Sequence, residues 1–308
     1  MTHQANHARG MAIMAFAMML LPLMDAIAKW LATASSMAPG QVTFLRFALQ
    51  MLFSALLVAG TGGFARLRPA RLWPNLIRGV LLGGASLCFF TAVKYMPLAD
   101  AMAIFFVEPM ILTVLSAVFL REPVGWRRWS AVGVGFVGAL IVIQPSFALF
   151  GLAALLPLGT ATFFATYMLL NRRLTLHDSP LVMQYAAGIG GTALTGAALG
   201  VGLVFGIDDL MPGLPPDAAA WSLLLLLGVL ATFGHLFVVQ AFRHAEASLL
   251  APFQYIEIIS ATLVGLLVFG DFPSASKWLG IAIIVGSGLY TFWRESRRRE
   301  RPRPVPKV

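Results

Sequence analysis

Charged residues are scarce in this chain, making up 11% of its 308 residues, whereas hydrophobic residues make up 59%. The mean hydropathy is +0.83. Since a typical soluble domain carries about 25% charged residues, the composition excludes a soluble globular protein. The apolar segments are also longer than the ~9–11 residues of a membrane barrel strand. Because helices satisfy their own backbone hydrogen bonds in lipid, the sequence predicts an all-α integral membrane protein.

Cysteine and the common catalytic motifs are also missing. Cys88 is the one cysteine and lies within an apolar segment, which excludes an intrachain disulfide and a cysteine-based metal site. The chain has no Gly-x4-Gly-Lys-Ser/Thr phosphate loop and no His-Glu-x-x-His motif, and its five histidines are scattered. We therefore expect no cofactor, no metal site, no catalytic residue set and no ATP hydrolysis by this chain.

Ten apolar segments are long enough to be spanning helices, which need about 17–25 residues. We predict ten transmembrane helices, with ends uncertain by a few residues. The predicted segments are Gly10–Leu31, Gln41–Ala59, Leu76–Tyr95, Leu98–Leu120, Trp126–Ile143, Leu149–Leu170, Leu181–Phe205, Ala218–Phe242, Ala247–Phe269 and Lys277–Trp293.

The net charge of +9 comes from cations placed between the apolar segments, which indicates membrane orientation rather than a nucleic-acid partner. If both termini lie in the cytoplasm, 18 of the 22 lysines and arginines fall on that side. We therefore predict a multi-pass protein of the inner membrane with both termini cytoplasmic. Residues 294–308 are basic and rich in proline, and predict a disordered cytoplasmic tail near anionic lipid.

Residues 89–129 and 238–278 follow the same plan, 149 positions apart. In each, a polar break precedes an intramembrane acid, and a second acid and a tryptophan follow; Glu257 falls opposite Glu108. Identities between the two stretches are few, so the argument depends on placement. Each repeat would hold five spans, and an odd number turns the second repeat upside down in the membrane. The predicted inverted repeats are residues 10–143 and 149–293.

Three charged residues lie in the first two predicted spans. Asp25 and Lys29 are four residues apart, on one helical face, where they can neutralise each other. A structural ion pair and a role with the substrate or a coupling ion are both open. Arg46 is a candidate for shaping the outer half of a binding site, with snorkelling to the interface as the alternative.

Glu108 and Pro109 are the strongest site candidates. A carboxylate at membrane depth costs ~2.5–3.5 kcal/mol on insertion scales, so it persists mainly beside a partner or a wet cavity. Pro109 cannot donate a backbone hydrogen bond and predicts a kink beside the acid. Bent or broken helices near the midplane are where secondary transporters build their binding sites. A simple helix bend is the alternative for Pro109.

The remaining candidates are aromatic or polar residues within apolar spans. Gln254, Tyr255 and Glu257 lie close together in the ninth span, which makes it the most polar stretch of the second half. Phe105 could line a cavity, although an aromatic side chain in a bundle more often serves packing. His235 in the eighth span could bind substrate, or could be a hydrogen-bonded helix contact.

The sequence resembles the EamA-type transporters of the drug/metabolite transporter superfamily. The resemblance is carried by DAIAKWL, Gln41–Arg46, KYMPLADA, Glu108–Pro109 and Arg121–Pro123, and covers Met11 to about Arg294. It implies ten helices and one central cavity lined mainly by the third, fourth, eighth and ninth spans, with help from the first and sixth. Glu257 departs from the acid-plus-proline pattern because Ile258 follows it.

Three functions are compatible with these features. The first is a secondary active transporter that moves a small organic metabolite, such as an amino acid, a nucleoside-like compound or a flavin-type vitamin, by alternating access, with proton coupling or exchange. The second is an intramembrane lipid-modifying enzyme, which would need an acid/base pair that Asp100 and Glu108 do not form, lying ~80° apart around a helix. The third is a membrane scaffold, disfavoured by the costly acids. Substrate, direction and coupling ion are open, as is the choice of monomer or homodimer.

Overall fold

The computed structural model describes residues 2–63, 67, 69–119, 125–174, 178–245, 250 and 253–299. All regular structure in these ranges is helical. The long helices are α1 (Thr2–Thr33), α2 (Pro39–Gly62), α3 (Leu72–Tyr95), α6 (Trp126–Phe150), α7 (Leu156–Leu174), α8 (Pro180–Phe205), α9 (Ala218–His244) and α12 (Ala275–Arg299). The shorter elements are α4 (Leu98–Phe105), α5 (Glu108–Phe119), η2 (Gly151–Leu155), η3 (Asp208–Leu210), α11 (Ile256–Val264) and the π-helix η4 (Gly265–Phe269).

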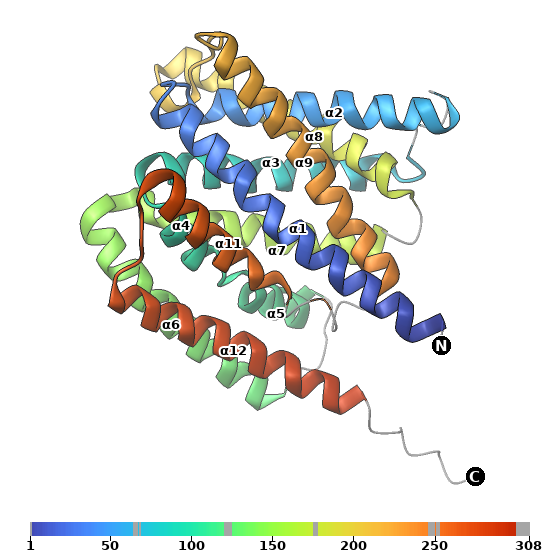
Figure 1. Cartoon of the computed structure of the whole chain (residues 1–308), viewed down its shortest axis with the longest axis vertical. Coiled ribbons are helices and arrows are strands. Elements are labelled where there is room, and N and C mark those ends of the chain that lie inside the picture. The colour runs from blue at the N-terminus through green and yellow to red at the C-terminus, as the bar shows by residue number, and fades with distance from the viewer. Residues whose placement is uncertain are drawn as a thin grey trace.

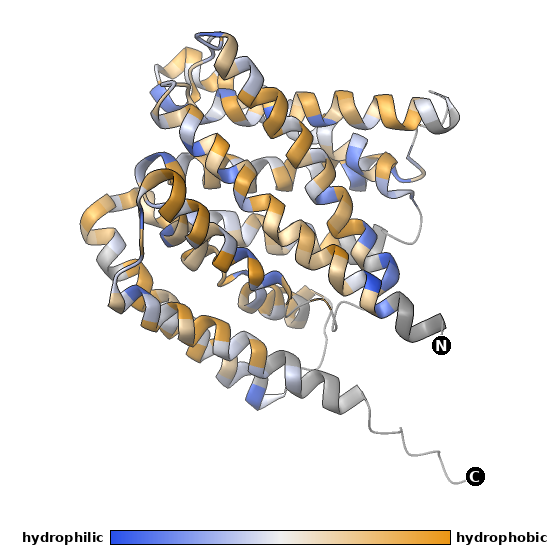
Figure 2. Ribbon diagram, viewed as in Figure 1, coloured by the Kyte–Doolittle hydropathy of each residue, from blue (hydrophilic) through white to orange (hydrophobic). Residues whose placement is uncertain are grey.

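The outer surface of the bundle is apolar enough to face lipid. Large hydrophobic side chains such as those of Val204, Phe205 and Leu267 are more than 70% exposed. Figure 2 shows hydrophobic residues along every helix, on outward as well as inward faces. Among the residues that the structure describes, seven helical segments are long and apolar enough to cross a membrane, and three shorter apolar helices accompany them. These ten segments overlap the ten predicted ones, but the count of ten spans and the inverted repeat stay predictions.

The two halves of the chain are interleaved rather than set side by side. The helix α1 packs against α9, α2 against α8, and α6 against α12, so each of these pairs joins an early helix to a late one. Figure 1 shows α6 and α12 together along one side of the bundle, with α2 at the opposite side. The start of α1 and the end of α12 lie at the same end of the bundle.

Glycine permits the closest of these helix contacts. Gly190 of α8 lies so near α3 that a Cβ atom would fall 2.2 Å from the Leu76 carbonyl oxygen, and Gly138 of α6 meets Gly280 and Ile283 of α12. Ala282 and Gly286, four residues apart in the last helix, form a small-residue face that allows close helix contact within the monomer or between monomers. Both are exposed in the structure, because the helix turns Gly280 and Ser287 toward α6.

Several element boundaries differ from the prediction. The fifth predicted segment ends at Ile143, but α6 continues to Phe150. The predicted tail begins at residue 294, but α12 remains helical through Arg299, so the tail boundary is wrong. Residues 300–308 lie outside the described part, as does Arg121–Pro123.

In the described part of the chain, three ion pairs join the two halves near the ends of helices. Lys29 Nζ lies 2.6 Å from Asp271 Oδ2, and Lys94 Nζ lies 2.5 Å from Asp209 Oδ1. Asp100 pairs with Lys277. Asp100 is also within electrostatic range of Asp271 and Lys29, so two of the pairs form one four-charge cluster between α1, α4 and the start of α12. In all three pairs, one partner comes from the first half of the chain and one from the second.

The close approach of α3 and α8 at Gly190 leaves no room for a larger side chain at this position. We expect Gly190→Ala to lower the melting temperature in detergent, because the added methyl would collide with backbone that cannot move aside. Gly200→Ala on the same helix is the control: nothing lies within 4 Å of a Cβ there, and alanine favours helix by ~1 kcal/mol over glycine. Equal melting temperatures for the two variants would contradict this packing.

The burial of the Asp100–Lys277 pair predicts a large cost for breaking it. The Asp100 side chain is 2% exposed, so we expect Lys277→Met to destabilise the protein by ~3–5 kcal/mol. Lys94→Met should cost less than ~1 kcal/mol, because both partners of that pair are more than 20% exposed. Thermal unfolding in detergent ranks the two variants, and adding Asp100→Asn to Lys277→Met should restore most of the loss. A similar loss in both single variants would count against the burial argument.

Candidate functional site

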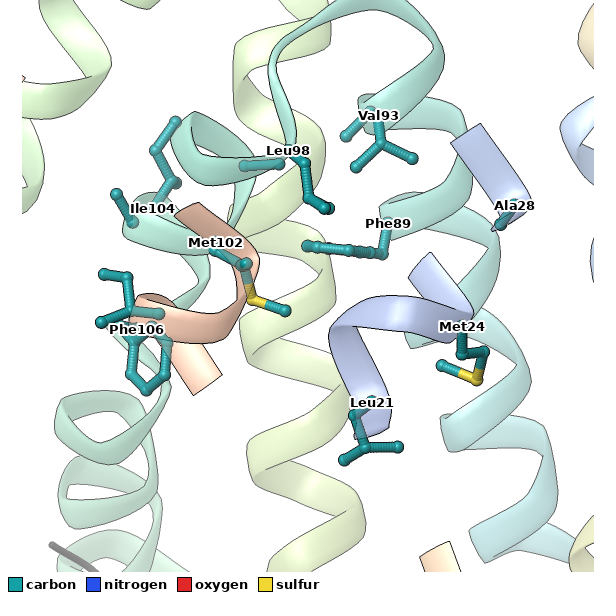
Figure 3. Packing of buried hydrophobic residues seen from close by; sticks show 14 of the residues in the cluster. Leu21, Met24, Ala28, Phe89, Val93, Leu98, Met102, Ile104 and Phe106 are labelled. Atoms are coloured by element: carbon teal, nitrogen blue, oxygen red, sulfur yellow. The ribbon is translucent and has the colours of Figure 1, made fainter. Parts of the chain in front are cut away.

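A cavity lies at the centre of the bundle, between helices of both halves. Its empty volume is about 990 Å³ including space open to solvent, which reaches the size range of small-molecule sites. The walls come from α1, α3, α4, α5, α7, α9 and α11. Leu21, Phe89 and Met102, labelled in Figure 3, line the cavity from α1, α3 and α4, and Phe106 lines it from the turn after α4.

Three carboxylates line the cavity: Asp25 from α1, Glu108 from α5 and Glu257 from α11. Glu257 lies within electrostatic range of the other two, so the three acids form one group. Asp25 and Glu257 form no hydrogen bond or ion pair with any residue that the structure describes. Asp25 is nevertheless buried, with 5% of its surface exposed. The cavity therefore gathers three carboxyl groups, which are negatively charged when ionised, in a region of low dielectric.

Broken helices place two of these acids. The fourth predicted span is divided into α4 and α5 by a turn at Phe106–Val107, and Glu108 is the first residue of α5. Pro109 follows. Its backbone nitrogen has no hydrogen to donate to a preceding carbonyl, so the helix is interrupted rather than continuous. In the second half, α11 starts at Ile256 and holds Glu257 in its first turn. A carboxylate is favoured there because the first backbone N–H groups of a helix are unpaired.

Arg46 lies behind the wall of the cavity. Its side chain is 0% exposed, and its Nη1 donates to the hydroxyl of Ser86 at 3.0 Å, with Ser86 itself lining the cavity. The guanidinium carbon sits 4.2 Å from the centre of the Phe47 ring, and Asp25 lies within its electrostatic range. The snorkelling alternative is therefore wrong, because the side chain turns into the bundle and not toward the interface. Its Nε and Nη2 have no partner among the described residues.

The predicted pairing of Asp25 with Lys29 is also wrong. Lys29 points toward the end of the bundle, where it pairs with Asp271 and lies 4.5 Å from the centre of the Phe269 ring. Asp25, one turn earlier, faces the cavity and the charge of Arg46. Residues four apart share a helical face but are separated by about 6 Å along the axis, so tertiary neighbours can divide them. Lys29 is thus placed as a structural link and Asp25 as a cavity residue.

A cluster of aromatic rings forms the apolar wall. Phe105 makes edge-to-face contacts with Phe89, Phe106 and Phe164, with ring centres 5.6–6.2 Å apart. Phe164 extends the cluster to Tyr167. These five residues line the cavity. Phe105 thus serves both packing and the wall, and the two readings of this residue are not exclusive.

Seven of the ten predicted site residues line the cavity, namely Asp25, Phe105, Glu108, Pro109, His235, Gln254 and Glu257. His235 also donates from Nδ1 to the carbonyl of Ala231, one turn earlier in the same helix, at 3.0 Å. Its ring is therefore hydrogen-bonded within α9 and also reaches the cavity. Tyr255 does not line the cavity. Its ring stacks on Phe106 and its hydroxyl packs against Gly288, where it supports the wall from behind.

Several wall residues could not be identified from the sequence. Ser86, Thr160, Phe164 and Tyr167 look like ordinary residues of apolar spans, and only their placement around the cavity distinguishes them. Arg78, near the start of the predicted segment Leu76–Tyr95, is fully buried, donates to the Met183 carbonyl and lies over the Tyr167 ring.

Known proteins are similar to this chain in sequence and in fold over nearly its whole length. The chain is 28% identical to a riboflavin transporter of Vibrio cholerae serotype O1 over 284 residues, which is 92% of each protein. It is 26% identical to an S-adenosylmethionine uptake transporter of Rickettsia prowazekii, covering 89% of this chain and 88% of that one. One solved crystal structure has the same fold, with a TM-score of 0.64 at 20% identity, and covers 92% of this chain and 96% of its own.

The family comparison agrees with the resemblance seen in the sequence. The model of the EamA-like transporter family matches twice, at residues 8–144 and 151–293, one match in each half. Together the two matches cover more than half of the chain, and the relatives above are membrane transporters of small molecules. The chain, a multi-pass helical membrane protein with an acid-lined central cavity, therefore belongs to the EamA-like transporter family.

Proposed function

We propose that this protein is a secondary active transporter that moves a small organic metabolite across the cytoplasmic membrane by alternating access. The observation that carries the proposal is the central cavity, whose walls come from both halves and whose acids Glu108 and Glu257 sit at helix breaks. A site shared by two halves can be exposed to either side when one half moves against the other.

The helix contacts support two repeats related by a two-fold axis. If the first five spans correspond in order to the last five, α1 corresponds to α7 and α3 corresponds to α9. The contact between α1 and α9 should then have a counterpart between α7 and α3, which is present. The α3–α8 contact likewise has its counterpart in α9–α2, and the α5–α7 contact in α1–α11. The pairs α2–α8 and α6–α12 would lie on the axis. Such paired contacts are what inverted repeats of five helices produce.

The relatives and the cavity favour a planar metabolite as substrate. Riboflavin and S-adenosylmethionine both carry a flat heterocycle, and the Phe105 cluster offers aromatic faces and edges against which a ring can stack. We therefore propose a flavin-type or nucleoside-like compound ahead of an amino acid. Uptake by proteoliposomes of labelled riboflavin and S-adenosylmethionine tests this order directly.

Glu108 is proposed as the coupling group. Burial in low dielectric favours the protonated form of a carboxyl group, so a substrate or a change of access can release or take up its proton. We expect Glu108→Gln to abolish the pH dependence of uptake or efflux in proteoliposomes, while Asp208→Asn, an exposed acid outside the cavity, leaves it intact. Unchanged pH-dependent transport in the glutamine variant would remove Glu108 from the coupling step.

The proposed orientation, with both termini cytoplasmic, can be tested with the chain's single cysteine removed. In a Cys88→Ser background, Ala34→Cys lies in the loop after α1 and Gly125→Cys lies just before α6; both positions are exposed. We expect a membrane-impermeant maleimide to label Ala34→Cys in intact cells and to label Gly125→Cys only after permeabilisation. The opposite pattern would reverse the topology.

A further inference from the structure

The charge of the cavity wall is strongly one-sided. Asp25, Glu108 and Glu257 line it, whereas no lysine or arginine is found in that wall within the described part of the chain. Arg46 lies within electrostatic range of Asp25, but it stands behind Ser86 and does not line the cavity. One buried guanidinium cannot balance both Asp25 and Glu257, so the wall carries an excess of negative charge when these two acids are ionised.

Neighbouring cations are committed to other partners. Lys29 pairs with Asp271, and Lys277 pairs with Asp100, both at one end of the bundle. Arg78 donates to the Met183 carbonyl and lies in electrostatic range of Asp178. None of these side chains lines the cavity. Within the described ranges, no further lysine or arginine therefore faces Asp25 and Glu257, and their compensating charge has to enter with protons or with a ligand.

The two acids without a protein partner define where a positive group would sit. Asp25 and Glu257 come from different halves of the chain, α1 and α11, and face the same space. Beside them the rings of Phe106 and Phe105 belong to the same wall. Carboxylates stabilise a cation by charge, and the faces of aromatic rings do so through their quadrupole.

We infer that the cavity selects an organic cation, with its positive centre between Asp25 and Glu257 and its planar apolar part against the Phe105 cluster. An anion of the same shape would meet carboxylates and no cation in the wall. This inference rests on the proposed function, because it names the chemical class of substrate that the same cavity would carry.

Three naphthalene probes of similar shape test the inference: naphthylmethyl-trimethylammonium, uncharged naphthalenemethanol and naphthalenesulfonate. Binding is measured by calorimetry on the full chain in lipid nanodiscs, with empty nanodiscs as the blank for partition into lipid. We expect the cation to bind at least about tenfold tighter than the neutral probe, which corresponds to ~1.4 kcal/mol, and the anion to bind most weakly. Equal binding of cation and anion, or no binding of the cation, would overturn the inference.

Variants of the two unpartnered acids give a second readout. We expect Asp25→Asn and Glu257→Gln each to weaken binding of the cation about tenfold, or ~1.4 kcal/mol, with little change for the neutral probe. Asp208→Asn removes the same charge outside the cavity and should change neither. Equal loss of all three probes in folded variants would point to general damage and refute the assignment. If a variant does not fold, the probe series on the native chain still decides.

The binding measurement separates this inference from the proposed function. If proteoliposomes show no flux of any metabolite while the cation preference holds, the transport proposal fails and the cation site stands. If flux occurs but neutral or anionic compounds bind best, the transport proposal stands and the cation site is refuted.

Discussion

The cost of a charge in an apolar bundle is the constraint on which this structure depends. The fold meets it in two ways, and each has its own place. At one end of the bundle, Lys29, Lys94 and Lys277 are paired with carboxylates from the opposite half of the chain. At the centre, three carboxylates line a cavity, and two of them, Asp25 and Glu257, form no ion pair with a described residue. The paired charges hold the halves together, whereas Asp25 and Glu257 create a demand for a ligand or for protons.

These two arrangements suit a protein that has to move. Ion pairs between the halves can separate and re-form without changing the packing within either half, and they lie apart from the cavity. In the proposed transport cycle, α1 would connect such a movement to the site, since Asp25 and Lys29 lie one turn apart on it, with one at the cavity and the other at the end of the bundle. A substrate that neutralises the cavity would thus act on the same helix that carries an ion pair between the halves.

Much of the site could be predicted because intramembrane acids are rare and expensive. Glu108 and Glu257 were conspicuous for that reason, and Pro109 indicated the break that the structure shows between α4 and α5. Partners were harder to predict. The i, i+4 rule predicted that Asp25 pairs with Lys29, but the rule describes an isolated helix. In the folded chain Lys29 pairs instead with Asp271, which lies 242 positions away in the sequence.

The sequence by itself determined the membrane class, the ten apolar segments and the identity of the acids, because these depend on composition, length and local periodicity. Only the tertiary structure decided which side chains meet. It turned Arg46 and Arg78 inward, gathered Phe105 and Phe164 into one wall, and gave close helix contacts within the chain to Gly190 and Gly138. The physical reason is that a helix in an apolar bundle is hydrophobic on all faces, so its sequence does not say which face is buried.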